Sequence, residues 1–409
     1  MSHDAAALRA QFPILAPASD GRRIHYLDNA ASAQSPLTVL DAVRRYETTQ
    51  RANVHRGVHR LAEAATGAYE GARATVARWL NVATDEIVFT SGATAAINLV
   101  AHGFGDALAA GDQIVISGIE HHANIVPWQM LRDRRGLRLD ALPVTDEGRI
   151  DTAALGRVMT ARCRLIAVTH CSNVTGAETD VAPIVAAARA VGAAVLLDGA
   201  QRVPHGPLDL AALGVDFYAF AGHKAFGPNG VGVLWGRRER LAAMAPFMGG
   251  GEMIRRVTLE ATTWADPPQR FEAGTPPIGQ AVGLAAAIDW MAGLDWPAAT
   301  AHERALTERL LNGLGAIAGV RVLGPSGLQG RIGTVSFDVE GIHPHDVAQI
   351  LDSLDVACRG GHHCAQPLMD RFDLPGTTRA SLAPYNDAKD IDRLLEGIAL
   401  ARRKFGLAR

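Results

Sequence analysis

Hydrophobic positions between residues 86 and 235 follow two alternating patterns. Short runs rich in apolar residues, typical of strands buried on both faces, recur along this region. They are Glu86–Thr90, Gln113–Ser117, Arg138–Pro143, Leu165–His170, Ala194–Asp198, Asp216–Phe220 and Val231–Trp235. Segments of helical period, such as Ala93–Leu108 and Ala182–Val191, lie between several of them. The repeat predicts an α/β fold with a mostly parallel, seven-stranded sheet covered by helices on both sides.

The pattern changes after about residue 280. Longer helical segments alternate there with a few apolar runs, which predicts a smaller α+β domain. The predicted helices are Gln280–Ala292, Ala298–Leu314, Pro344–Ser353 and Ala388–Lys404, and the predicted strands are Val320–Leu323 and Gly333–Val339. We therefore expect an N-terminal arm over residues 1–40 that contributes to the small domain, a large domain over 41–280 and the small domain over 281–409.

Composition narrows the classes of function. The 409 residues carry a net charge of −2, so no strong electrostatic attraction to nucleic acid or membranes is expected. No apolar run reaches the roughly 18 residues of a membrane span, and the first residues lack the pattern of a secretory signal. The cysteines at 163, 171, 358 and 364 form no CxxC pair, which favours reduced thiols in a cytoplasmic protein.

Two charged residues follow neighbouring predicted strands. Asp198 ends one strand, and Lys224 follows the next between glycines. Ligands of such sheets bind beyond the carboxyl ends of the strands. A lysine and an aspartate facing one crevice suit pyridoxal phosphate (PLP), with the lysine as the Schiff-base residue and the acid keeping the ring nitrogen protonated. The simpler alternatives are an exposed lysine in a turn and an aspartate that caps a helix.

The same sheet edge has candidates for a phosphate site and for proton transfer. The segment Thr90–Thr94 ends a strand and begins a helix, whose N-terminal N–H groups can bind an anion. It is also a good helix cap, so on its own it is a weak signal. His121, in the run Glu120–Asn124, follows another strand. The alternative for His121 and His122 is a metal-binding or surface pair.

A glycine- and histidine-rich segment, Arg359–Pro367, contains Cys364 beside an arginine. Such surroundings favour a low-pKa, nucleophilic thiol, whereas the commoner alternative is an inert buried cysteine. We assign the other cysteines to that inert class. Arg379 is a candidate clamp for a carboxylate, with a surface arginine as the alternative.

Together these motifs resemble the PLP-dependent cysteine desulfurases of the SUF iron–sulfur assembly pathway, in the class-V aminotransferase group. The matching segments are Tyr26–Ala31, Val54–His59, Glu120–Trp128, Thr169–Gly176, Asp198–Gln201, Gly222–Lys224, Arg270–Pro276 and Arg359–Pro367. They span nearly the whole chain, and the segment around Cys364 is the most specific, resembling the type with a short cysteine loop. The resemblance implies the PLP-dependent transferase fold type I.

The resemblance also implies roles around the cofactor. Lys224 would form the Schiff base and move the Cα proton, and Asp198 would pair with the pyridine nitrogen. His121 would stack on the ring and act as acid and base, and Gln201 would bond the ring hydroxyl oxygen.

The implied phosphate site consists of Thr94 and His223, joined by Thr275 from a second subunit. That contact implies a homodimer. Two residues depart from the family pattern: Ala221 stands where a serine often contacts the phosphate, and Ala95 stands where an acidic residue is common. Neither change removes a catalytic group.

On the substrate side, Asn173 would contact cofactor and substrate, and would bind the substrate carboxylate together with Arg379. Arg359 would lie near the reacting sulfur, and Cys364 would attack it. The implied reaction converts L-cysteine to L-alanine and leaves a persulfide on Cys364, from which a small acceptor protein of the SUF system takes sulfur for iron–sulfur cluster assembly.

Several other functions remain open at this stage. A selenocysteine lyase or a cysteine-sulfinate desulfinase would use the same cofactor chemistry with less help from a thiol. A PLP-fold protein without catalysis would serve as a scaffold or sensor. A metal hydrolase would use His121, His122, His362 and His363. The motif around Cys364 favours the desulfurase.

Overall fold

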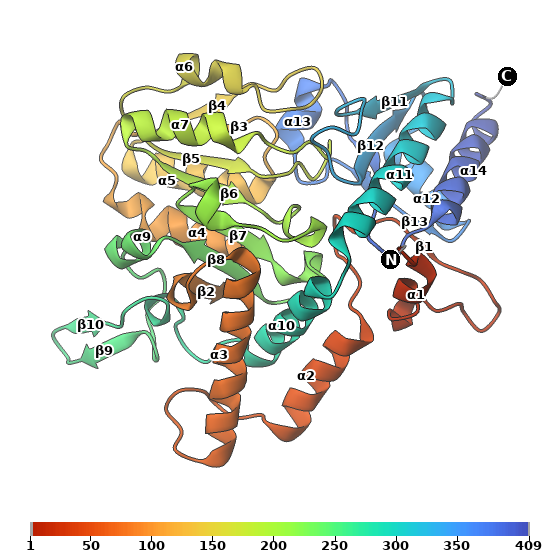
Figure 1. The fold of residues 1–409 in the computed structure, drawn as a ribbon. Coiled ribbons are helices and arrows are strands. Elements are labelled where there is room, and N and C mark those ends of the chain that lie inside the picture. Colours follow the sequence, from red (N-terminus) through yellow and green to blue (C-terminus); the bar gives the residue numbers. More distant parts are fainter. Residues whose placement is uncertain (1–2, 408–409) are drawn as a thin grey trace.

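The computed structural model describes residues 3–407, and its centre is a seven-stranded sheet (Figure 1). The strands lie in the order β2-β8-β7-β6-β5-β3-β4, and β8 alone runs antiparallel to its neighbours. Their bounds are β2 Ile87–Thr90, β3 Gln113–Ser117, β4 Arg138–Leu142, β5 Cys163–Thr169, β6 Ala194–Asp198, β7 Phe217–Ala221 and β8 Gly232–Gly236. The predicted mostly parallel sheet is confirmed, each strand within a few residues of its expected bounds.

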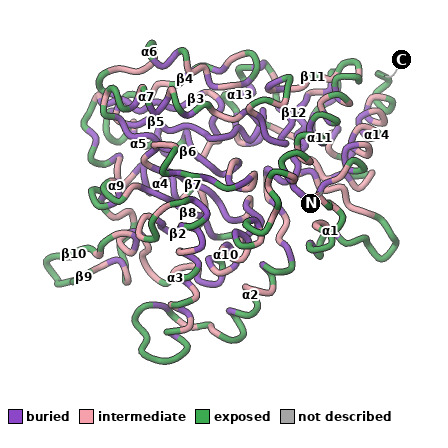
Figure 2. The backbone as a smooth tube through the Cα atoms, in the orientation of Figure 1, coloured by how far each residue is buried: buried purple, intermediate pink, exposed green. Residues whose placement is uncertain are grey.

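Helices cover both faces of this sheet, because its strands are apolar on both sides. In β6, Val195 and Leu197 pack into the core shared with α3, α7 and α10, whereas Ala194 and Leu196 pack into the core shared with α4 and α5. These helices are α3 Arg60–Leu80, α4 Ala93–Gly103, α5 Val126–Arg135, α7 Val181–Val191 and α10 Ile278–Ala292. The buried strands form the central layer in Figure 2.

Some helices differ from expectation. The helix predicted over Ala93–Leu108 ends at Gly103 and continues as a 3₁₀ turn, Gly105–Ala107. A side chain at Gly105 would meet Leu131 at 2.3 Å, so glycine allows close packing against α5 there. Further helices carried no assignment from the sequence: α2 Leu37–Thr49, α3, α5, α6 Leu155–Val158, α8 Leu210–Leu213, α9 Arg238–Ala243 and α13 Gln366–Arg371.

The C-terminal part has a second, antiparallel sheet of four strands in the order β11-β12-β15-β14. Its elements are α11 Trp296–Gly315, β11 Val320–Leu323, β12 Thr334–Val339, α12 Pro344–Asp352, β14 Arg359–Gly361, β15 Thr377–Ser381 and α14 Ala388–Lys404. A separate hydrophobic core joins these helices and strands, apart from β14. The segment that begins at Arg359, predicted as a loop, therefore starts with an edge strand. Its pairing with β15 stabilises this strand, although its residues have no apolar pattern.

The arm begins with α1 Ala5–Arg9 and reaches the small sheet's side of the molecule. Its strand β1, His25–Tyr26, pairs in parallel with β13, Val356–Ala357. The His25 ring also bonds Asp390 of α14 at 2.8 Å. The domain boundaries at residues 40 and 280 stay predictions.

One hairpin, β9 Ile254–Val257 and β10 Thr262–Trp264, projects from the molecule. Among residues 3–407, no helix is both long and apolar enough to cross a bilayer.

Candidate active site

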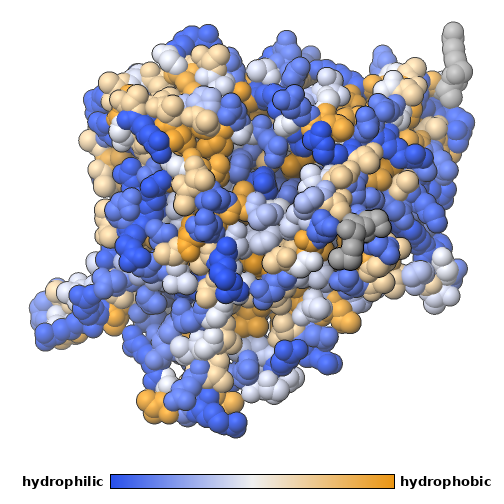
Figure 3. All heavy atoms as spheres, in the orientation of Figure 1, coloured by the Kyte–Doolittle hydropathy of each residue, from blue (hydrophilic) through white to orange (hydrophobic). Residues whose placement is uncertain are grey.

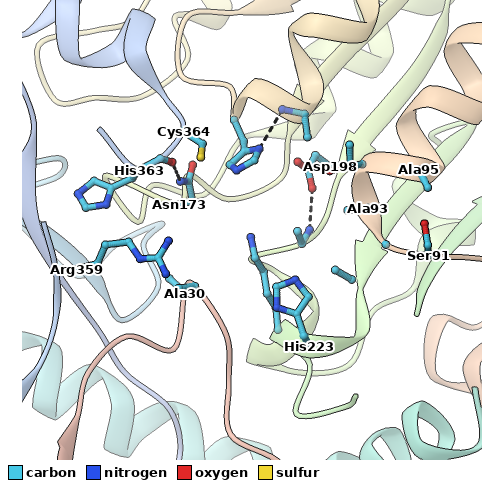
Figure 4. Close-up of a pocket in the computed structure, with 18 of the residues that line it drawn as sticks. Ala30, Ser91, Ala93, Ala95, Asn173, Asp198, His223, Arg359, His363 and Cys364 are labelled. Carbon is cyan, nitrogen blue, oxygen red and sulfur yellow. Dashed lines mark hydrogen bonds between the residues drawn. The ribbon is translucent and has the colours of Figure 1, made fainter. Parts of the chain in front are cut away.

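A cavity of about 330 Å³ opens at the carboxyl ends of the parallel strands. Most residues predicted for the site line it: Thr94, His121, Asn173, Asp198, His223, Lys224, Arg359, Cys364 and Arg379. They come from the end of β6, from β14 and β15, and from the segments that follow β2, β3, β5, β7 and β14. Figure 4 shows Cys364 and Arg359 on one side of the cavity, Ser91 and Ala93 on the other, and Asp198 between them.

Lys224 and Asp198 form the charged centre of the cavity. Burial lowers the pKa of Lys224 to about 8, although the Asp198 carboxylate opposes this shift. Burial raises the pKa of Asp198, whose Oδ1 accepts a hydrogen bond from the Ala200 backbone N–H at 3.0 Å. Among the described residues, the Lys224 amine has no hydrogen-bond partner. An amine with this pKa is partly neutral near pH 8, as bond formation to a carbonyl carbon requires.

The N-terminus of α4 forms one wall of the cavity. Ser91–Ala95 line it, and Gly92 has a φ of +156°, a conformation that favours glycine. Backbone N–H groups in the first turn of a helix have no intrahelical acceptor, so this end is suited to an anion. Thr94 and His223 line the same cavity.

His121 is fixed at the start of a 3₁₀ turn. Its Nδ1 accepts a hydrogen bond from the Ala123 backbone N–H at 3.0 Å, so in the neutral ring the proton sits on Nε2. Burial lowers the pKa of His121 to about 3, and the nearby Lys224 charge adds to the shift. The ring is therefore neutral at pH 7.

Glu120, which sequence reasoning did not single out, anchors the segment that carries His121. Its carboxyl group accepts hydrogen bonds from Asn124 Nδ2 at 2.7 Å and from the Thr169 N–H at 2.9 Å. Burial raises the pKa of Glu120 to about 8. The only sequence signal was its place in the Glu120–Trp128 motif.

Cys364 lies in a strained, well-tethered segment. His363 and Cys364 have φ values of +53° and +55°, which are unfavourable for residues with a side chain. The Cys364 carbonyl accepts from the His122 N–H at 2.7 Å, and the His363 carbonyl accepts from Asn173 Nδ2 at 2.8 Å. These bonds hold the partly exposed thiol of Cys364 against the cavity.

The other cysteines lie in different surroundings. Cys163 and Cys171 are buried, and burial raises the pKa of both thiols. Burial and the charge of Asp28 raise the pKa of Cys358 well above its ordinary value.

Two arginines lie side by side on neighbouring strands of the small sheet. Arg359 on β14 is the direct register partner of Arg379 on β15. Arg379 is 2% exposed, and its Nη1 donates to the Asn173 carbonyl at 3.0 Å. Its Nε is buried and has no partner among the described residues. That free donor in the cavity wall fits a carboxylate ligand.

Asp28 joins these two arginines. Its Oδ1 accepts from Arg379 Nη2 at 3.1 Å, and its Oδ2 accepts from Arg359 Nε at 3.3 Å. Sequence reasoning gave Asp28 no role, although it lies in the Tyr26–Ala31 motif.

Two predicted residues do not line the main cavity. Gln201 is buried, donates from Nε2 to the Ala30 carbonyl at 2.8 Å, and faces a smaller adjoining cavity that Lys224 also lines. Thr275 lines a separate hollow of about 460 Å³, whose wall includes Ser91 and Ala95 from the start of α4. The part of the chain described here has no group of three His, Cys, Asp or Glu side chains placed to hold a metal ion.

The residues present fit PLP. The cavity combines a lysine of lowered pKa, a buried carboxylate beside it and a neutral imidazole. A helix N-terminus suited to a phosphate forms its wall, and the partnerless Arg379 Nε suits the carboxylate of an amino acid.

Comparisons with known proteins agree with this fit. Residues 25–394 match the family model described as Aminotransferase class-V. A probable cysteine desulfurase 2 from Mycobacterium leprae is 49% identical over 410 residues, covering 98% of each chain.

Two solved structures extend the likeness to the fold. The crystal structure of the cysteine desulfurase CsdA from Escherichia coli has a TM-score of 0.90 and 38% identity, covering 98% of this chain and 99% of that one. A C-DES mutant with glycine covalently linked to its PLP cofactor has a TM-score of 0.81 and 26% identity, covering 96% and 98%. This chain therefore belongs to the class-V aminotransferase family and, within it, to the PLP-dependent cysteine desulfurases.

Proposed function

We propose that the chain converts L-cysteine to L-alanine and retains the sulfur as a persulfide on Cys364. The observation that supports this most is the tethering of Cys364 at the wall of the cavity that also contains Lys224 and Arg379. The sulfur of Cys364 bonds to the substrate sulfur while the substrate C–S bond breaks. The electron pair of that bond stays with the substrate Cβ, which takes up a proton to become the methyl group of alanine. No external oxidant is needed.

The cofactor, when bound, stabilises the electron pair left on the substrate Cα. Lys224 would hold it through the amine and Asp198 would hold its ring nitrogen. The N-terminus of α4, with Thr94 and His223, would hold the phosphate. His121 would lie against the ring and Gln201 would bond the ring hydroxyl.

The substrate would be held by Asn173 and by Arg379, whose Nε is unpartnered. Arg359 lies nearer the solvent, with 49% of its side chain exposed, and would lie beside the reacting sulfur. Lys224, with its lowered pKa, suits removal of the Cα proton. The neutral His121 carries a proton on Nε2, which makes it a suitable general acid for protonating the substrate.

The wider setting is also part of the proposal. We infer a homodimer in which Thr275 joins the phosphate site of the other subunit. A sulfur-acceptor protein of the SUF system would take the persulfide sulfur from the partly exposed Cys364 for iron–sulfur cluster assembly. The four free cysteines support a reducing compartment such as the cytoplasm.

Replacement of the thiol tests the proposal. Cys364→Ser should lower L-alanine formation from L-cysteine by at least about 100-fold, because the hydroxyl cannot accept the sulfur. Turnover of selenocysteine should persist. Cys358→Ser is the matched control, six positions earlier, and should keep native activity.

The assay measures alanine and sulfide in the presence of a reductant, with PLP content checked by absorbance. A Cys364→Ser protein that keeps its cysteine activity would refute the persulfide step. The selenocysteine lyase or cysteine-sulfinate desulfinase function would then replace it.

A further inference from the structure

The arrangement of Arg359 and Arg379 poses an electrostatic problem. Like charges placed directly opposite on antiparallel strands repel each other. Arg379 is almost completely buried, so water screens its charge poorly. Burial lowers the pKa of Arg379, and Asp28 opposes this shift. The carboxylate of Asp28 thus balances one of the two positive charges.

Asp28 is held firmly in that position. The residue before it, Leu27, is fully buried, and its carbonyl accepts from the Ser381 N–H at 2.7 Å. On the other side, Asn29 Nδ2 donates to the Ser381 carbonyl at 2.7 Å. Asp28 itself forms an isolated bridge with Ser381 at the end of β15. The backbone of Asp28 is therefore fixed beside Arg359 and Arg379, which line the cavity.

The charge balance has a consequence for the substrate. Two guanidinium groups and one carboxylate leave one net positive charge, which matches the single carboxylate of L-cysteine. A substrate with a second anionic group on its side chain, such as L-cysteine sulfinate, would place that group near Arg359, where the charge is already neutralised by Asp28. Without Asp28, the pair would carry two positive charges and suit a dianion.

We propose that Asp28 is a positioning residue that sets substrate specificity: by pairing with Arg359 and Arg379 it favours amino acids with one anionic group over those with two. The inference rests on the proposed function, since it assumes that the two arginines face the substrate. It concerns the choice between cysteine and cysteine sulfinate, which the proposed function alone does not decide.

The variant Asp28→Asn keeps the size of the side chain and removes its charge. We expect the ratio of kcat/KM for L-cysteine sulfinate to that for L-cysteine to rise about tenfold, because one charge is removed within contact distance of both arginines. The matched control is Asp146→Asn. Asp146 also pairs with an arginine, Arg371, but its side chain is 96% exposed and does not line the cavity.

Anion binding gives a readout that does not depend on turnover. Calorimetry on the PLP-loaded protein would compare malonate, a dianion, with propionate, a monoanion. Asp28→Asn should bind both anions more tightly, and its gain in affinity for malonate should exceed its gain for propionate about tenfold. The double variant Asp28→Asn with Arg359→Gln restores one net positive charge and should return both ratios to native values.

A purely structural role predicts a different result. If Asp28 only supports the fold, both substrates and both anions should weaken together in Asp28→Asn, which would overturn the inference. If that variant does not fold, Arg359→Gln with Asp28 retained should lower the sulfinate-to-cysteine ratio below the native value, and an unchanged ratio would overturn it. A native protein that makes no alanine from L-cysteine would instead refute the proposed function.

Discussion

At the residue scale, the site depends on how the fold changes ordinary side-chain chemistry. Lys224 is an ordinary lysine in sequence, but burial lowers its pKa to about 8. The order of strands could be used to place Lys224 and Asp198 at one sheet edge, and both line the cavity. The size of the pKa shift could not be predicted, because it comes from atoms packed around the amine in space.

The lowered pKa predicts how cofactor uptake depends on pH. The lysine must be neutral to bond to a carbonyl carbon, and its neutral fraction rises as the pH passes through about 8. Uptake of PLP by the cofactor-free protein should therefore accelerate about tenfold between pH 7 and pH 9. Absorbance of the bound cofactor measures the rate. Lys224→Ala should lack this phase. A rise of about a hundredfold over the same range, as expected for a lysine with its ordinary pKa, would contradict the lowered pKa.

Residues that position other site residues were the hardest to identify from the sequence. Asp28 and Glu120 both lie within motifs that carried the family resemblance, yet neither received a role. The partners of Asp28 are more than 300 positions away, at Arg359 and Arg379. Hydrophobic pattern and motif spacing contain no information on such pairs, which form only when the arm pairs with the small sheet.

At the element scale, continuous apolar runs predicted the central sheet, because buried parallel strands need them. The edge strand β14 was missed, since Arg359-Gly360-Gly361 has no such run. The antiparallel direction of β8 could not be predicted from its composition either. This strand matters because its first residue, Gly232, packs against the turn at Gly92. A Cβ at Gly232 would lie 2.4 Å from the Gly92 Cα.

This close contact predicts that Gly232→Ala weakens cofactor binding. The backbone of Gly92 would have to move, which displaces the N-terminus of α4 and its N–H groups. We expect the dissociation constant for PLP to rise at least about tenfold, with a loss of about 1–3 kcal/mol in unfolding free energy. Fluorescence titration and chemical denaturation would measure the two effects.

Gly236→Ala is the matched control at the other end of β8. Its Cβ would meet the Leu241 side chain at 2.8 Å, so it should also destabilise the fold. Gly236 lies away from the α4 N-terminus, so the affinity of the Gly236→Ala protein for PLP should stay native. Equal losses of PLP affinity in both variants would show that lower stability alone explains the effect.

At the scale of the whole molecule, Thr275 is one of the two assigned residues that do not line the main cavity. Thr275 lines the neighbouring hollow instead, beside Ser91 and Ala95. Large apolar side chains are exposed nearby at Met248 in the same hollow and at Val58 between α2 and α3. The chain between α2 and α3 forms a lobe, and hydrophobic atoms are visible at its tip (Figure 3). A second subunit on this side would cover such groups.

The proposed homodimer predicts complementation between two inactive variants. Thr275→Asp would place a carboxylate against the phosphate of the partner's site, and Cys364→Ser would inactivate its own site. In a mixed dimer, the site with native Cys364 receives native Thr275 from the other subunit, whereas the second site has both defects. After unfolding and joint refolding in equal amounts, about a quarter of native alanine formation should return, because half of the dimers are mixed and each has one working site. Each variant refolded alone should stay inactive. If Thr275 served its own subunit, no mixed dimer would contain a working site and no activity would return.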